Sequence, residues 1–152
     1  MTGPSFRFRL ERVRVVRERK EKLAQRELAD ALLRRSSTVD ELRAADAHLE
    51  HARAEQRTVA TGPKTVSATD LLARQAFLER VEAQRLLRAH ELEQREAEVA
   101  ERDAELATAA SEHEMLNRLR ERHRGEHDRE QARRERNTLD EIAVTRFRRG
   151  SA

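Results

Sequence analysis

The stretch VATGPKTVSATD, residues 59–70, decides the fold of this chain. It contains Gly62-Pro63, which separates a long charged segment from a longer one. Proline inside a helix removes a backbone hydrogen bond and clashes with the preceding turn. Because the one other proline is Pro4, no proline forbids helix elsewhere between roughly residues 6 and 147. The sequence therefore predicts two long helices joined at this break.

The residues after the break carry the signals of a helix start. Residues 67–70, Ser-Ala-Thr-Asp, form a capping box, and Val66 and Leu71 are placed to form a hydrophobic staple around it. We expect one helix over about residues 6–59, a turn over about 60–67 and a second helix over about 68–147. Acid–base pairs four residues apart should add a few tenths of a kcal/mol each. They are Asp30 with Arg34, Glu91 with Arg95, Glu98 with Arg102, and Glu130 with Arg134.

The composition excludes a conventional globular core. Of the 152 residues, 40% are charged and 3% are aromatic, and Trp, Tyr and Cys are absent. This composition is typical of a coiled coil but also of a disordered chain, so periodicity has to decide. Apolar residues recur at steps of seven on narrow seams, as packing between two helices requires, although Arg35, Asp46 and His113 interrupt them. The seam residues are Leu28, Leu42, Leu49, Ala24, Ala31, Ala45 and Ala52 before the break, and Leu92, Val99 and Leu106 after it.

Folding the chain at the break sets the register of the two helices. Residue i then faces roughly residue 129 − i, which places Val13 near Leu116 and Leu28 near Val99. We therefore predict an all-α fold, a single antiparallel coiled-coil hairpin over residues 1–152, in which the second helix overhangs the first by about 24 residues. The overhang would start near Gly125, which either marks a bend or is a glycine tolerated on the surface.

The charge is basic at both ends of the chain. Residues 1–27 hold nine Lys and Arg against four Asp and Glu, and residues 118–152 hold eleven against seven. No apolar run approaches the roughly 20 residues of a membrane span, and the N-terminus lacks the apolar core of a signal peptide. The absence of Cys fits a reducing compartment. We expect a cytoplasmic protein without direct membrane insertion.

One motif invites an enzymatic interpretation. Residues 123–127, HRGEH, match the H-x-x-E-H pattern of a group of zinc enzymes. A two-helix hairpin supplies no third ligand, apolar shell or cleft for a catalytic zinc ion, and no other catalytic or phosphate-binding pattern is present. The arginines alternate with acidic residues and no nucleic-acid-reading motif appears. We predict no enzyme activity, no cofactor, no metal and no nucleic-acid partner.

Both ends of the chain resemble a known family. Residues 8–13, FRLERV, look like the opening F-x-L-E-x-V/L of the FliJ family, and residues 136–143, RNTLDEIA, resemble its closing L/M-D-E-x-A. FliJ proteins are components of the bacterial flagellar type III export apparatus. The resemblance implies a central stalk that regulates the hexameric export ATPase, contacts the membrane export gate and carries export chaperones. It also implies a location at the cytoplasmic face of the inner-membrane export apparatus.

The resemblance also suggests binding surfaces. Those implied for the export ATPase comprise Arg7, Arg9, Arg12, Arg14, Arg133, Arg134, Arg136, Leu139, Asp140 and Glu141, and those for the export gate comprise Leu42, Ala45, Phe77 and Val81. Phe77 has a plainer explanation, which is packing over the seam near the turn. Two other functions stay open: the equivalent stalk of a virulence type III secretion system, and a structural coiled-coil spacer.

Overall fold

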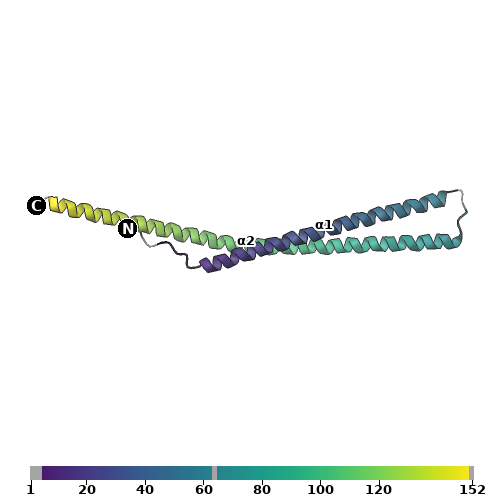
Figure 1. Cartoon of the computed structure of the whole chain (residues 1–152), viewed down its shortest axis with the longest axis horizontal. Helices are drawn as coiled ribbons and strands as arrows, with labels where there is room; N and C mark the ends of the chain where they lie inside the picture. Colours follow the sequence, from purple (N-terminus) through teal and green to yellow (C-terminus); the bar gives the residue numbers. More distant parts are fainter. Residues whose placement is uncertain (1–4, 63–64, 151–152) are drawn as a thin grey trace. The chain divides into compact units, whose positions relative to one another are not determined.

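A computed structural model describes residues 5–62 and 65–150 of the chain (Figure 1). Helix α1 spans Glu11–Thr61 and helix α2 spans Ala68–Gly150, and the described residues contain no strand. The predicted all-α helical hairpin is thereby confirmed. Pro63 of the predicted break lies outside the described residues. Helix α1 begins at Glu11 rather than near residue 6, and the Glu11 N–H donates to the Phe8 carbonyl at 3.2 Å in the turn before it.

The start of α2 follows the predicted capping signal. The backbone N–H of Asp70 donates to Ser67 Oγ at 3.1 Å, and the Ser67 hydroxyl donates to Asp70 Oδ2 at 2.8 Å. The N–H of Leu71 closes the first helical turn onto the Ser67 carbonyl. The Ser67 hydroxyl thus accepts from a backbone N–H that has no partner inside the helix. The negative charge of Asp70 lies in the first turn of α2, where the positive end of the helix dipole stabilises it.

The chain divides into two compact units. The first, here called the turn unit, runs from Leu23 to Leu106 and contains the connection between the helices. The second, here called the terminal unit, combines the chain up to Lys22 with the chain from Ala107 onward. Each unit is described in turn.

Small side chains form the core of the turn unit. They recur every seven residues along α1, and we call them the alanine seam: Ala24, Ala31, Thr38, Ala45 and Ala52. All except the half-buried Ala45 are buried, and Ala31 is 0% exposed. A methyl group can be covered completely only where the opposite helix approaches closely. The Thr38 hydroxyl donates to the Arg34 carbonyl at 3.0 Å, so its burial leaves no hydrogen bond unmade.

Ion pairs between the helices flank this seam and report the register. Arg88 pairs with Glu41 at 2.9 Å, and Arg102 pairs with Glu27 at 3.6 Å. Both pairs obey the expected relation between residue i and residue 129 − i, and in the terminal unit Arg17 and Glu112 obey it too. The antiparallel register predicted from the break is therefore confirmed.

Most of the predicted pairs within a helix are replaced. Glu130 and Arg134 do pair, at 3.1 Å. Arg34 instead reaches across to Glu98 at 2.6 Å. The other two arginines pair with acidic residues three positions further along α2. Arg95 contacts Glu98, and Arg102 contacts Glu105. The i,i+4 rule describes an isolated helix, and here carboxylates of the second helix lie within reach and compete for the same arginines.

The terminal unit ends in a helix segment without a cover. Every residue of α2 from Ala132 to Gly150 is exposed, and we call this segment the overhang. Gly125 lies in the same helix, and a Cβ built there would meet nothing within 4 Å. The structure therefore gives no steric reason for a glycine at this position.

We expect Ala31→Leu to destabilise the hairpin by about 1–3 kcal/mol, because a covered methyl site has no room for three further carbons. Urea unfolding followed by circular dichroism would measure the free energy of unfolding. The control is Ala29→Leu, the same change at an exposed position of the same helix turn. Equal stability of the two variants would contradict the alanine seam as a site of close packing.

Candidate partner-binding surfaces

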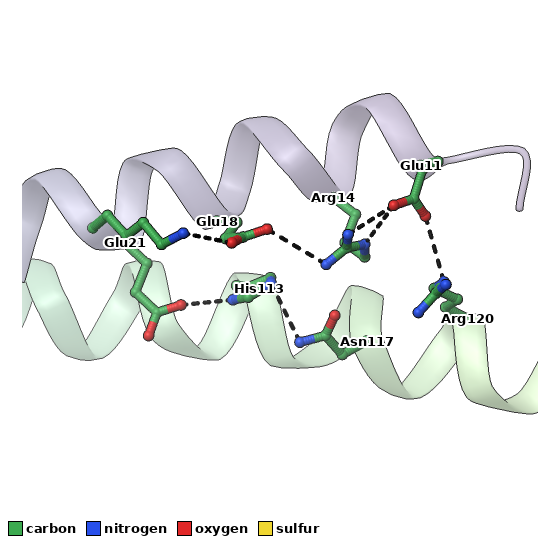
Figure 2. Close-up of polar contacts among 8 residues, drawn as sticks. Glu11, Arg14, Glu18, Glu21, His113, Asn117 and Arg120 are labelled. Atoms are coloured by element: carbon green, nitrogen blue, oxygen red, sulfur yellow. Dashed lines mark hydrogen bonds and ion pairs between the residues drawn. The ribbon is translucent and has the colours of Figure 1, made fainter.

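Where the helices of the terminal unit meet, a group of charged and polar side chains lies between them (Figure 2). Glu11 forms an ion pair with Arg14 at 2.7 Å and a second one, at 3.4 Å, with Arg120 of α2. Glu18 forms ion pairs with Lys22 at 2.6 Å and with Arg14 at 3.6 Å. We call the whole group the terminal polar cluster: Glu11, Arg14, Glu18, Glu21, Lys22, His113, Asn117 and Arg120.

His113 is the centre of this cluster on the α2 side. Its Nδ1 lies 2.6 Å from Glu21 Oε2 on α1, and the Asn117 side-chain nitrogen lies 3.3 Å from its Nε2 (Figure 2). Both ring nitrogens therefore have a polar partner, a carboxylate of α1 at Nδ1 and an amide of α2 at Nε2. The histidine that interrupts the predicted seam is therefore fully hydrogen-bonded between the two helices.

Two acidic groups of the cluster are favoured in their ionised form by hydrogen bonds from basic side chains. The hydrogen bond from Arg14 lowers the pKa of the Glu11 carboxyl below its usual range, and the hydrogen bond from Lys22 does the same for the pKa of Glu18. Arg14 is consequently held within the cluster and is only half exposed. Of the arginines predicted to bind the ATPase near the N-terminus, Arg7, Arg9 and Arg12 are the ones exposed to solvent.

The segment before α1 lies against α2 through aromatic contacts. The ring of Phe6 lies 5.7 Å from that of His127, and the ring of Phe8 lies 5.9 Å from that of His123 in an edge-on arrangement. Phe8 is 8% exposed, and it is the only buried aromatic residue among those described. We call residues 5–10 the aromatic strap.

The overhang holds the remaining residues predicted to bind the ATPase. Leu139 is 64% exposed, and Ile142 and Ala143 follow it at the spacing that places three side chains on one helix face. Arg134 is paired with Glu130, whereas the Arg136 guanidinium bonds the Ala132 carbonyl at 3.4 Å. The exposed residues of the predicted set in this segment are Arg133, Arg134, Arg136, Leu139, Asp140 and Glu141.

The residues predicted to bind the export gate lie in the turn unit. Phe77 is 40% exposed, contacts the His48 ring edge-on at 6.0 Å, and lines an open cavity of about 750 Å³ with Val59 and Val66. Ala45 lines a neighbouring cavity of about 460 Å³ together with Val81. The four residues of the predicted gate-binding set differ in burial. Val81 is 3% exposed, whereas Leu42 and Ala45 are half-buried.

A comparison of the sequence with profiles of known protein families identifies the family of this chain. The profile of the FliJ family, described as Flagellar FliJ protein, matches residues 6–152. The chain belongs to the FliJ family. No curated protein and no solved structure matches it. The resemblance expected from the two ends of the sequence is confirmed, and this FliJ chain is a component of the flagellar export apparatus.

Both histidines of the H-x-x-E-H match in this FliJ chain contact phenylalanine rings of the aromatic strap. Among the described residues, no group of three or more His, Cys, Asp or Glu is arranged to hold a metal ion. In the same part of the chain, neither helix has a stretch apolar and long enough to cross a membrane.

Sequence reasoning missed the aromatic strap, although a signal for it was present. Phe6 and Phe8 alternate with Arg7 and Arg9, and the antiparallel register brings these residues opposite the two histidines of residues 123–127. The expected start of the first helix near residue 6 concealed this pairing, because in a helix residues 6 and 8 do not share a face.

We expect the ion pairs of Glu98 to add a pH-dependent part to the stability of this FliJ chain. Hydrogen bonds from Arg34 and then Arg95 lower the pKa of the Glu98 carboxyl below its ordinary value of 4.5. A lowered folded-state pKa gives stability that is present above the unfolded-state pKa and is lost as pH falls through the folded-state pKa. Glu98→Gln should therefore destabilise the protein at neutral pH, and its difference from wild type should shrink as the pH falls below about 4.5.

Urea unfolding at about pH 7 and about pH 3 would check this expectation. The matched control is Glu101→Gln, the same change at an exposed glutamate of α2. A difference between Glu98→Gln and wild type that stays constant with pH would contradict the proposed ion-pair contribution.

Proposed function

We propose that this FliJ protein is a non-enzymatic central stalk and regulator of the export ATPase ring, and an adaptor to the membrane export gate and the export chaperones. We place it in the cytoplasm, peripherally at the inner-membrane export apparatus. The observation that supports the stalk role above all is the overhang of α2, a long helical segment that is exposed on all sides.

The overhang has the properties of a helix that is completed by a partner. Leu139, Ile142 and Ala143 share a face, and an amphipathic helix gains stability by burying such a face. Residues 132–150 hold six Arg against three Asp and Glu, so the segment is basic. A basic helix is attracted electrostatically towards an acidic ring opening, which speeds its entry and favours one orientation. A structural spacer has no need of either property.

The adaptor role rests on the turn unit. Phe77 and His48 present an aromatic pair, and Phe77 borders a cavity whose lining combines apolar side chains such as Val59 and Val66 with the charged Asp70 and Arg74. Partly exposed aromatic residues at the edge of a cavity are frequent anchors of protein interfaces. We therefore keep Leu42, Ala45, Phe77 and Val81 as the proposed gate-binding set, with the buried Val81 holding the helices in place beneath the others.

Two alternatives remain to be compared with the stalk. The stalk of a virulence secretion system has the same physical requirements, and the match to a flagellar family favours the flagellar system. A coiled-coil spacer would bind no ATPase, so the two functions differ in a direct measurement.

We expect Leu139→Ser combined with Ile142→Ser to weaken the effect of this protein on oligomerisation and turnover of the cognate export ATPase by about tenfold or more, since two apolar anchors are lost. The half-maximal concentration of FliJ chain in an ATPase assay would measure it. Leu33→Ser is the control, because Leu33 is an exposed leucine of α1 outside the overhang. A wild-type chain that changes neither oligomerisation nor turnover would overturn the stalk function.

We expect Phe77→Ala to weaken binding of the soluble portion of the export gate by about tenfold, because an aromatic anchor at an interface contributes more than its neighbours. Isothermal titration calorimetry measures the affinity, and thermal unfolding measures stability in parallel. Leu72→Ala, at an exposed leucine in the first turns of α2, is the control. If Phe77→Ala lowers only stability and leaves the affinity unchanged, Phe77 serves packing over the seam instead.

A further inference from the structure

The aromatic strap has two different faces. Phe6 is half-buried and Phe8 is buried, and each contacts one histidine of α2. The two arginines that alternate with them, Arg7 and Arg9, are exposed. Such alternation arises where a chain in a non-helical conformation lies along a surface and turns successive side chains to opposite sides. The segment is thus fixed by its aromatic side chains and displays its cationic ones.

Its attachment is fixed at both ends. The Phe8 carbonyl accepts the N–H of Glu11, which ties the strap to the first turn of α1. His123 and His127 lie four residues apart on α2, so both rings share one face of that helix. Edge-on and tilted ring pairs at these distances add to the stabilisation that comes from the area they bury.

The displayed side of the strap includes a cationic cavity. Arg7 and Arg120 line an open cavity of about 330 Å³ together with Glu11 and the two phenylalanines. Glu11 is already engaged by Arg14 at 2.7 Å. A carboxylate from another molecule that enters this cavity would meet the exposed Arg7, whereas Arg120 already lies 3.4 Å from Glu11. Guanidinium groups bind carboxylates through charge-assisted hydrogen bonds.

We propose that the aromatic strap is a positioning device, in which Phe6 and Phe8 dock on His127 and His123 so that Arg7 and Arg9 form a preorganised site for carboxylates on an acidic protein surface. The inference rests on the proposed function, which assigns that surface to the export ATPase. Phe6, Phe8, His123 and His127 are positioning residues, because they act through the arginines.

The contacts with α2 order the aromatic strap before any partner binds. A free segment of six residues loses backbone conformational entropy at each residue that a partner orders. The strap has already been ordered by its contacts with α2, so its arginines bind without that cost. The exposed arginines complement the carboxylates of an acidic protein surface, which makes such a surface the partner that fits.

The experiment measures binding of the full chain to the cognate export ATPase by calorimetry. Arg7→Gln with Arg9→Gln removes the displayed charges, and Phe6→Ala with Phe8→Ala removes the anchors but keeps the charges. We expect each pair to weaken binding by about tenfold. Combining all four changes should cost no more than the stronger pair, because one site is lost in either case. The control, Arg19→Gln with Arg26→Gln, removes the same charge from exposed positions of α1.

Changes on α2 separate positioning from a purely structural role. His123→Ala with His127→Ala leaves the strap sequence intact and should weaken binding to the same extent. His123→Phe with His127→Phe keeps aromatic rings under the strap and should restore the wild-type affinity. Circular dichroism confirms that the helix content of each variant is unchanged.

The outcomes distinguish this inference from the proposed function. If the wild-type chain binds the ATPase but the phenylalanine pair binds as tightly as wild type, the positioning role is overturned alone. The same holds if the strap arginines behave like the control arginines. If the wild-type chain does not bind the ATPase at all, the proposed function and this inference are overturned together.

Discussion

Close approach of the two helices along the alanine seam is the constraint on which the turn unit depends. Ala31 is covered completely, and Ala24, Thr38 and Ala52 are buried at the same seven-residue spacing. A side chain of one carbon contributes little transfer free energy by itself. It does allow the helices to come together, so that dispersion contacts of the backbones replace those of large side chains. This explains how a chain with 3% aromatic residues forms an ordered hairpin.

The polar residues that interrupt the seams form pairs between the two helices. Arg35 contacts Glu96 and Asp46 contacts Arg85, and in the terminal unit His113 contacts Glu21. In each case the polar side chain pairs with an opposite or complementary group of the other helix. Exposed ion pairs contribute little to the free energy of unfolding. A shift of one helix along the other would separate all of these pairs at once, so their contribution is to specify the register.

The fold was largely predictable, because a single break and a seven-residue period leave few ways to pack two helices. The cap at Ser67 and the register followed from local rules. What failed were the rules that assume an isolated helix: Arg34 pairs with Glu98 and Arg102 also contacts Glu27, and both of these carboxylates belong to the opposite helix. At the candidate surfaces, the exposed overhang was predictable, whereas the strap was not. Its conformation is set by two histidines more than a hundred positions further along the chain.

The two units both have ion pairs between their helices, but they differ in how much apolar surface they bury, which bears on how a partner can act on them. Among the described residues, the turn unit buries Ala24, Ala31, Leu49, Ala52 and Val81, and the separation of its helices is opposed by the hydrophobic effect. The terminal unit buries only Phe8 and Ala109 among the described apolar residues, and water or a charged partner can replace its ion pairs at small cost. Local opening should therefore require less free energy in the terminal unit. A partner that reaches the paired part of the terminal unit meets ion pairs that can be exchanged, while the alanine seam of the turn unit keeps the helices paired.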